Sequence, residues 1–104
     1  MTFGIRIRQA RKVLSLTQKD TARRIGMSAQ YLNDIERDRR APPSDNFIEA
    51  LADALVIQRD VLYFYAGRLP PDLLSGNATD RQILNGFDAF RLTLGRLKVQ
   101  EAQP

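Results

Sequence analysis

The chain consists of short amphipathic runs separated by polar, glycine-containing or proline-containing breaks. Within residues 4–14, Ile7, Ala10 and Leu14 recur at the spacing of one helix face, while basic side chains occupy other positions. Similar runs cover residues 17–24, 28–37, 44–55 and 59–67. The alternating pattern typical of strands is absent from the sequence. The pattern therefore predicts five short helices in this part of the chain and an all-α fold.

Polar and glycine residues predict where several of these helices begin and end. Thr17, Ser28 and Ser44 are expected N-caps, because a hydroxyl oxygen at this position accepts a hydrogen bond from a free backbone N–H. Gly26 and Gly67 are expected to end their helices, since glycine readily adopts the left-handed conformation found there. The segment DRRAPP is expected to be a loop, because proline cannot continue a helix.

The second part of the chain begins with a segment rich in proline and glycine, residues 69–78, which is predicted to be a linker between a domain at 1–68 and a helix within 79–104. Thr79 and Gln82 form a capping box that opens this sixth helix, which is expected to reach about Gln100. An apolar stripe with spacings of 4, 3, 4 and 3 follows it: Ile83, Phe87, Phe90, Leu94 and Leu97. The stripe fits two arrangements, packing against its own domain or pairing with a second chain.

Charge divides the chain into two unlike parts. Residues 1–40 contain ten Lys or Arg and four Asp or Glu, whereas residues 41–104 contain six and eight. A basic N-terminal part indicates a surface that faces a polyanion, although ordinary solvated charge is the alternative. The chain has no cysteine and no histidine, which excludes the usual zinc sites, disulfides and Ser-His or Cys-His nucleophiles. We therefore expect no enzyme, no metal and no cofactor.

Membrane and export signals are also absent from the sequence. No run of 18 apolar residues occurs, so no membrane-spanning segment is expected. The first residues lack the apolar region of a secretory signal. These features favour a cytoplasmic protein without a membrane partner.

The predicted helices 17–24 and 28–37 are joined by a short turn at Gly26, an arrangement typical of the helix-turn-helix motif. In this motif the second helix enters the DNA major groove and its N-terminal residues reach base edges. The motif positions stand in order in this sequence: Thr17, Gln18, Ala22, Gly26, Ser28, Tyr31, Leu32, Ile35 and Glu36.

With these residues in place, the chain resembles the helix-turn-helix regulators of lambda-repressor and Cro type, also called the xenobiotic-response-element family. The resemblance covers roughly residues 3–68 and is strongest over 14–43. It implies a five-helix lambda-repressor-like DNA-binding domain, with the C-terminal helix serving for dimerisation. Members of the family are mostly phage, plasmid and bacterial transcription regulators that bind palindromic operators as dimers, which implies a bacterial or phage-infected cell.

The resemblance assigns candidate roles in the DNA major groove. The glutamine at the position of Gln18 binds a backbone phosphate in the family and can brace a base-reading side chain. Gln30 is the best candidate base reader, because its amide can pair with adenine N6 and N7. Ala29 could offer a methyl contact to thymine, and Asn33 could read an adenine or a phosphate. Asp34 departs from the family pattern: it could accept from cytosine N4, pair with an arginine, or act as a structural group.

Further candidates lie at the ends of the second motif helix. Ser28 is expected to be both an N-cap and a neighbour of phosphate. Tyr31 could bond a phosphate through its hydroxyl or serve as a packing ring. Arg37, Arg39 and Arg40 follow the helix and are candidate phosphate contacts, which position a protein without reading sequence. Their structural alternative is a solvated loop.

One charged pair is assigned a structural role by the resemblance. A glutamate at the end of the recognition helix pairs with an arginine of the first helix in the family, and Glu36 and Arg11 stand at these places. We expect an ion pair that ties the two helices together. Glu36 is accordingly not expected to be a catalytic acid.

Two functions of different class follow. The first is a sequence-specific DNA-binding transcription regulator, a repressor that binds a palindromic operator as a homodimer, with RNA polymerase as a possible partner. The second is an antitoxin that neutralises a toxin protein and autoregulates its operon. In that case the C-terminal helix and the segment RLPPDLL would form the partner surface.

Overall fold

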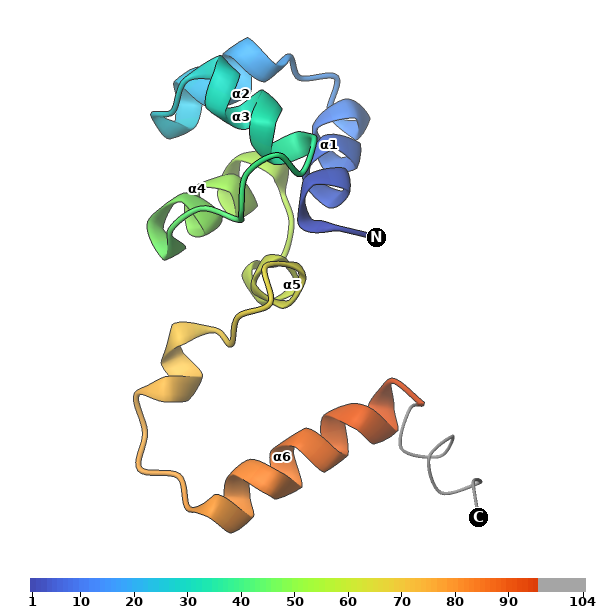
Figure 1. Ribbon diagram of the computed structural model, residues 1–104, viewed down its shortest axis with the longest axis vertical. Helices are drawn as coiled ribbons and strands as arrows, with labels where there is room; N and C mark the ends of the chain where they lie inside the picture. Colours follow the sequence, from blue (N-terminus) through green and yellow to red (C-terminus); the bar gives the residue numbers. More distant parts are fainter. Residues whose placement is uncertain (96–104) are drawn as a thin grey trace. The chain divides into compact units, whose positions relative to one another are not determined.

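Five helices surround one apolar core in the N-terminal part of the chain (Figure 1). The structure is a computed structural model and describes residues 1–95. The five helices are α1 (Phe3–Val13), α2 (Gln18–Ile25), α3 (Ala29–Glu36), α4 (Asp45–Leu55) and α5 (Arg59–Tyr65). A short 3-10 turn, η1 (Pro71–Leu74), follows within the predicted linker. The described residues contain helices and turns without strands, so the predicted all-α fold is confirmed.

The core is built from apolar side chains that recur at helical spacing. Ile7 of α1, Leu32 of α3, Ile48 and Leu51 of α4 and Leu62 of α5 are completely buried. Burying a side chain of this size contributes about 1.5–3 kcal/mol relative to leaving it exposed. The five helices therefore stabilise one another, although each is too short to persist alone in water.

A buried tyrosine joins this core without being evident from the sequence pattern. Tyr63 is completely buried in α5, and its hydroxyl donates to the Glu49 carboxylate at 2.8 Å. Burial, followed by this hydrogen bond, raises the pKa of Tyr63 to about 12. The phenol is therefore neutral at physiological pH and links α5 to α4.

Most of the predicted helix starts are confirmed by capping bonds. The Thr17 hydroxyl accepts from the backbone N–H of Asp20, and the Ser28 hydroxyl accepts from that of Tyr31, both at 3.0 Å. Ser44 occupies the N-cap position of α4, where its side chain makes no capping bond. Thr2 caps α1 in addition, through a bond from the backbone N–H of Ile5.

All five helices end in the same left-handed turn. The first or second residue after each helix end has a positive φ, and the next backbone N–H bonds back across the turn, as in a Schellman motif. For α3 this bond runs from the Arg39 N–H to the Asp34 carbonyl at 2.8 Å. The left-handed residues are Ser15 (φ 56°), Gly26 (80°), Asp38 (58°), Val56 (54°) and Gly67 (73°). The two glycine ends were predicted from the sequence, whereas the other three were not.

The C-terminal unit begins at Ser75 and contains α6 (Asp80–Thr93). Its predicted capping box is present: Thr79 Oγ1 accepts from the Gln82 backbone N–H, and the Gln82 side chain accepts from the Thr79 N–H. The prediction that the helix reaches Gln100 is wrong. The helix ends at Thr93 because Gly95 turns left-handed (φ 79°).

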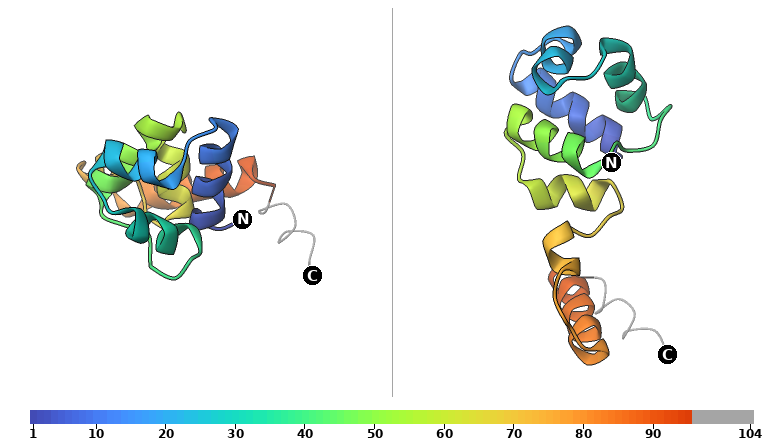
Figure 2. Two further views of the ribbon diagram at one scale, coloured as in Figure 1. Left: turned by 90° about the horizontal axis from the view of Figure 1, so that it is seen from above. Right: turned by 90° about the vertical axis from the view of Figure 1, so that its left-hand side faces the viewer.

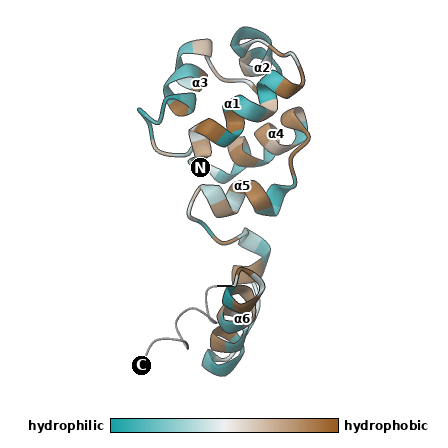
Figure 3. Cartoon of the chain, turned by 90° about the vertical axis from the view of Figure 1, so that its right-hand side faces the viewer, coloured by the Kyte–Doolittle hydropathy of each residue, from teal (hydrophilic) through white to brown (hydrophobic). Residues whose placement is uncertain are grey.

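The apolar stripe of α6 is shortened accordingly. Ile83, Phe87 and Phe90 lie within the helix and Leu94 is its C-cap, whereas Leu97 lies outside the described residues. Hydrophobic and hydrophilic positions interleave along α6 (Figure 3). None of the helices that the structure describes is both long enough and apolar enough to span a membrane.

Candidate nucleic-acid interface

Helices α2 and α3 form the end of the N-terminal unit that lies opposite α5 (Figure 2). Thr21 and Ala22 of α2 and Leu32 and Ile35 of α3 are buried, which fixes the pair against the core. The outer side of α3 remains accessible: Ala29 and Gln30 are exposed, and Asn33 and Asp34 are half-buried. The local sequence thus produces a short helix that is held firmly and presents polar side chains.

The predicted ion pair between Arg11 and Glu36 is present and almost completely buried. Arg11 Nε donates to Glu36 Oε2 at 2.8 Å and Arg11 Nη2 donates to Oε1 at 2.9 Å, so the contact is bidentate. Arg11 Nη1 also donates to the Leu16 carbonyl at 2.8 Å. The hydrogen bond to Glu36 raises the pKa of Arg11 against the opposing effect of burial. The pair ties the end of α3 to α1 and to the loop before α2.

Gln18 extends this buried pair toward the surface. Its Nε2 donates to Glu36 Oε1 at 3.0 Å and to Asn33 Oδ1 at 3.2 Å. An amide nitrogen carries two hydrogens, so both are used inside the protein. The side chain of Gln18 therefore braces Asn33, and it retains only its oxygen for other contacts. The free backbone N–H groups at the start of α2 are the donors that this element can offer to a phosphate.

Gln30 and Asp34 are paired along the exposed side of α3. Gln30 Nε2 donates to Asp34 Oδ1 at 3.0 Å, four residues further along the helix. The amide of Gln30 keeps its oxygen and one N–H for a further partner. Asp34, which departs from the family pattern, thus bonds a neighbouring amide in this structure rather than an arginine.

Tyr31 of α3 packs against α4 and against the loop that follows α3. Its ring makes an edge contact with Phe47, with centroids 6.4 Å apart, and the Arg40 guanidinium lies 5.1 Å from the ring centroid. A cation over an aromatic face is attracted by the ring quadrupole. Of the two roles considered for Tyr31, the packing role is visible in the structure. The contact also restrains Arg40.

The loop after α3 forms one side of a shallow surface depression. The depression has a volume of about 530 Å³ and is lined by Tyr31, Arg39, Arg40, Ala41, Pro42, Pro43, Ser44 and Arg68. Two of these residues, Arg39 and Arg40, are exposed arginines of the loop, and Arg37 is exposed just before them. The candidate phosphate contacts therefore lie on the accessible surface directly beyond α3.

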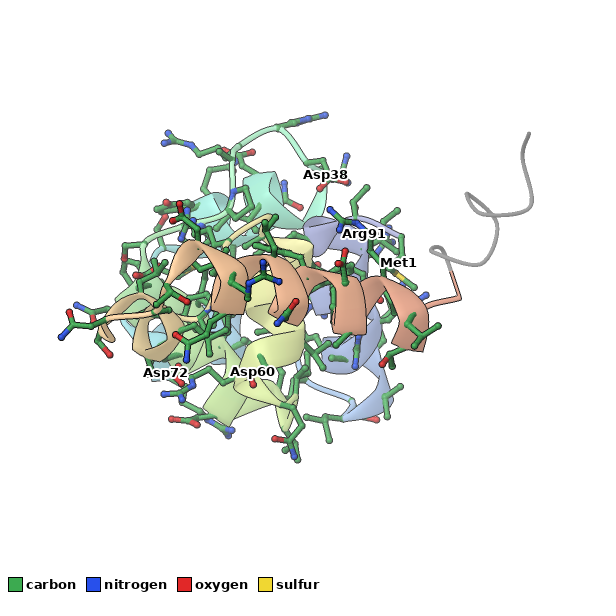
Figure 4. The ribbon with its side chains drawn as sticks, turned by 90° about the horizontal axis from the view of Figure 1, so that it is seen from below. Met1, Asp38, Asp60, Asp72 and Arg91 are labelled. Atoms are coloured by element: carbon green, nitrogen blue, oxygen red, sulfur yellow. The ribbon has the colours of Figure 1, made fainter. Side chains whose placement is uncertain are left out.

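Two residues that position this loop were not predicted from the sequence. Arg68, beyond α5, donates to the Pro42 carbonyl at 3.0 Å and to the Asp45 carboxylate at 3.2 Å. Asp38 (labelled in Figure 4) accepts from Thr2 Oγ1 at 2.7 Å and from the Gly4 N–H at 3.2 Å. Asp38 thus fixes the start of the loop to the start of α1. No local sequence pattern indicates that either residue holds the loop, because both contacts are made to segments distant in sequence.

The described part of the chain contains no group of three metal-ligating side chains that could hold an ion. What the site presents instead is a rigid helix with amide and carboxylate groups on its outer side, followed by a basic loop. This arrangement defines a helix-turn-helix unit, whose second helix is suited to the major groove.

Comparison with known proteins agrees with this class. Residues 2–62 match the family described as "Helix-turn-helix domain", and the chain belongs to this family. It is 50% identical over 58 residues to an immunity repressor protein of Bacillus phage phi105, covering 56% of this chain and 40% of the repressor. It is 42% identical over 60 residues to YazB of Bacillus subtilis, an uncharacterised HTH-type transcriptional regulator, covering 58% of this chain and 86% of that protein.

Solved structures give the same assignment. The P22 c2 repressor, in complex with a synthetic operator, matches with a TM-score of 0.55 and 31% identity, covering 60% of this chain and 92% of the repressor. A chain of the SinR–SinI protein complex matches with the same TM-score at 22% identity, over 90% of this chain and 99% of that chain, which supports the fold. The matched region spans less than half the length of the phage phi105 repressor and of the mycobacterial regulator Rv0474, at 40% and 48%.

Proposed function

We propose that this protein is a sequence-specific DNA-binding regulator of transcription, which represses by occupying a palindromic operator as a homodimer in a bacterial or phage-infected cell. The observation that carries the proposal is the bracing of α3. Its polar outer side is held by the Arg11–Glu36 pair and by Gln18, so its side chains are preorganised for a groove. Preorganised groups lose less conformational freedom on binding.

Each part of the interface has a distinct task in the proposal. Gln30 reads an adenine through its remaining amide oxygen and N–H, with Ala29 against a neighbouring thymine methyl. Ser28, Arg37, Arg39 and Arg40 contact phosphates and set the position of the helix. The similar proteins support this class of activity, because they include an immunity repressor and a repressor in complex with a synthetic operator.

The proposed homodimer is supported by the geometry of operators. Two recognition helices must enter the major groove about 10 base pairs apart, centre to centre, when an operator has two half-sites. The apolar stripe of α6 is the element of this chain that we assign to pairing. Ile83, Phe87 and Phe90 are the residues of the stripe that lie within the helix.

The first test is selection of binding sites from a random duplex library with the purified protein at near-physiological salt. The proposal predicts enrichment of an inverted repeat with half-sites about 10 base pairs apart. Enrichment of a single half-site would remove the dimer and retain DNA binding. Absence of any enrichment with a folded protein would overturn the proposal.

Two variants then distinguish a residue that reads a base from a residue that contacts phosphate. Gln30→Ala is expected to relax specificity at one base pair and to weaken binding there by about 1–3 kcal/mol. Arg39→Ala is expected to weaken binding to all sequences alike and to flatten the salt dependence of the affinity. A uniform loss across base substitutions for Gln30→Ala would contradict its assignment as a base reader.

A further inference from the structure

A line of hydrogen bonds runs from the buried Glu36 carboxylate to the surface of α3. A carboxylate paired with arginine can only accept hydrogen bonds, and both Glu36 oxygens already accept from Arg11. The amide of Gln18 must therefore turn its nitrogen, rather than its oxygen, toward Glu36. The opposite orientation would set the amide oxygen against a carboxylate oxygen, where two acceptors repel.

The same constraint passes from Gln18 to Asn33. The second hydrogen on Gln18 Nε2 points to Asn33, and it requires an acceptor at that place. Asn33 meets the requirement with Oδ1, at 3.2 Å. The planar amide then directs Nδ2 away from Gln18. Among residues 1–95, Nδ2 of Asn33 has no hydrogen-bond partner, and Asn33 is only half-buried.

We propose that Asn33 contacts DNA as a hydrogen-bond donor through its outward NH2 group, with its orientation fixed from inside the protein by Glu36 through Gln18. This inference rests on the proposed function. The outward Nδ2 requires an acceptor, such as a phosphate oxygen, O6 or N7 of guanine, or N7 of adenine.

The two amides on the outer side of α3 thereby differ in the groups that they keep available. Gln30 gives one N–H to Asp34 and keeps an oxygen and an N–H, which suits adenine. Asn33 gives one acceptor position of its oxygen to Gln18 and keeps both N–H groups, so its outward side requires an acceptor. Of the two partners that the sequence left open for Asn33, phosphate and adenine, both offer such an acceptor.

Asn33→Asp tests the assignment with little change of shape. The aspartate retains an oxygen for Gln18 and replaces the outward NH2 with a negatively charged oxygen. We expect the free energy of unfolding to stay close to that of the wild type. The affinity for the selected operator should fall by roughly 10–100-fold, as for loss of a hydrogen bond to a charged group. Asn85→Asp, in α6, is the control for added charge and should bind as the wild type does.

Modified operators then identify the acceptor. Asn33→Ala should weaken binding by about tenfold. If the acceptor is a phosphate, one methylphosphonate substitution will abolish the difference between Asn33→Ala and the wild type. If it is a guanine, 7-deazaguanine at one position will do so. If it is an adenine, 7-deazaadenine will do so. The proposal would be overturned if no such substitution removed the difference, or if Asn33→Asp bound normally.

A measurement on the protein without DNA tests the orientation of the Gln18 and Asn33 amides independently of DNA binding. Hydrogen exchange of the side-chain NH2 groups, followed by nuclear magnetic resonance, should show slow exchange for Gln18 and fast exchange for Asn33. The reverse order would overturn the internal orientation. If the orientation held while no DNA site was selected, the proposed function would fail, and the DNA ligand of Asn33 would fail with it.

Discussion

At the scale of single residues, Val56 holds an unfavourable backbone conformation at the end of α4. Its φ is 54°, in the left-handed region, and its side chain is 79% exposed. A β-branched residue there pays a steric penalty of roughly 1–2 kcal/mol that glycine avoids. Because the exposed side chain is not part of the core, little packing offsets this penalty.

We predict that Val56→Gly stabilises the protein by about 1 kcal/mol, since relief of the steric penalty exceeds the additional entropy that glycine loses on folding. Val13→Gly is the matched control. Val13 is 82% exposed but is the last residue of α1, so glycine there should destabilise by about 0.5–1 kcal/mol. Urea titration followed by circular dichroism measures both free energies of unfolding. Equal effects for the two variants would disprove strain at Val56.

The left-handed helix ends also show how far the end of a helix can be predicted from a single residue. Gly26 and Gly67 were predicted, because glycine is the usual residue at this position. Ser15 and Val56 gave no such signal. In both cases the next residue is apolar and packs on the core: Leu16 after Ser15, and Ile57 after Val56. Burial of that following residue holds the turn whatever residue precedes it, and burial is a tertiary property.

At the scale of elements, the start of α1 lies directly against the end of α3. An added Cβ at Gly4 would lie 2.3 Å from the Ile35 carbonyl oxygen and 2.7 Å from that of Glu36. These neighbours are backbone atoms, which cannot rotate away. The contact allows Asp38 to accept from the Gly4 N–H, so glycine is required by close approach rather than by φ.

We predict that Gly4→Ala destabilises the N-terminal unit by about 3 kcal/mol, as expected for overpacking against backbone. Gly86→Ala is the control, because a Cβ there meets nothing within 4 Å and alanine favours a helix by about 0.5–1 kcal/mol. Thermal unfolding should show a lower Tm for the first variant only. A Gly4→Ala protein with unchanged Tm would mean that α1 and α3 can separate without loss.

Helix positions were the most predictable elements. The predicted segments 17–24 and 28–37 agree with α2 and α3 to within one or two residues, because caps and apolar spacing are local signals. The end of α6 was missed at Gly95, although glycine was visible there, since the apolar spacing continued beyond it. The network through Gln18 could not be derived from spacing, because the orientation of its amide depends on two side chains of α3, one of which is paired with Arg11 of α1.

At the scale of the whole molecule, the chain divides into an N-terminal unit with its own core and a C-terminal unit that contains α6. A single 14-residue helix cannot bury its apolar side without a partner surface. In a homodimer the same helix of a second chain would supply that surface. The Ile83–Phe87 side of α6 would then also set the distance between two recognition helices.

We predict that Phe87→Glu shifts the protein from dimer to monomer, because a buried carboxylate without a partner opposes association. Asn85→Glu, on the opposite side of α6, introduces the same charge and should leave the dimer intact. Sedimentation equilibrium over a range of concentrations measures the association directly. The Phe87→Glu monomer should keep its affinity for an isolated half-site and lose the additional affinity for the inverted repeat, since linked binding raises the effective concentration of the second module. An unchanged dimer in Phe87→Glu would place the association surface elsewhere on the chain, whereas equal weakening by both variants would point to charge rather than to the apolar stripe.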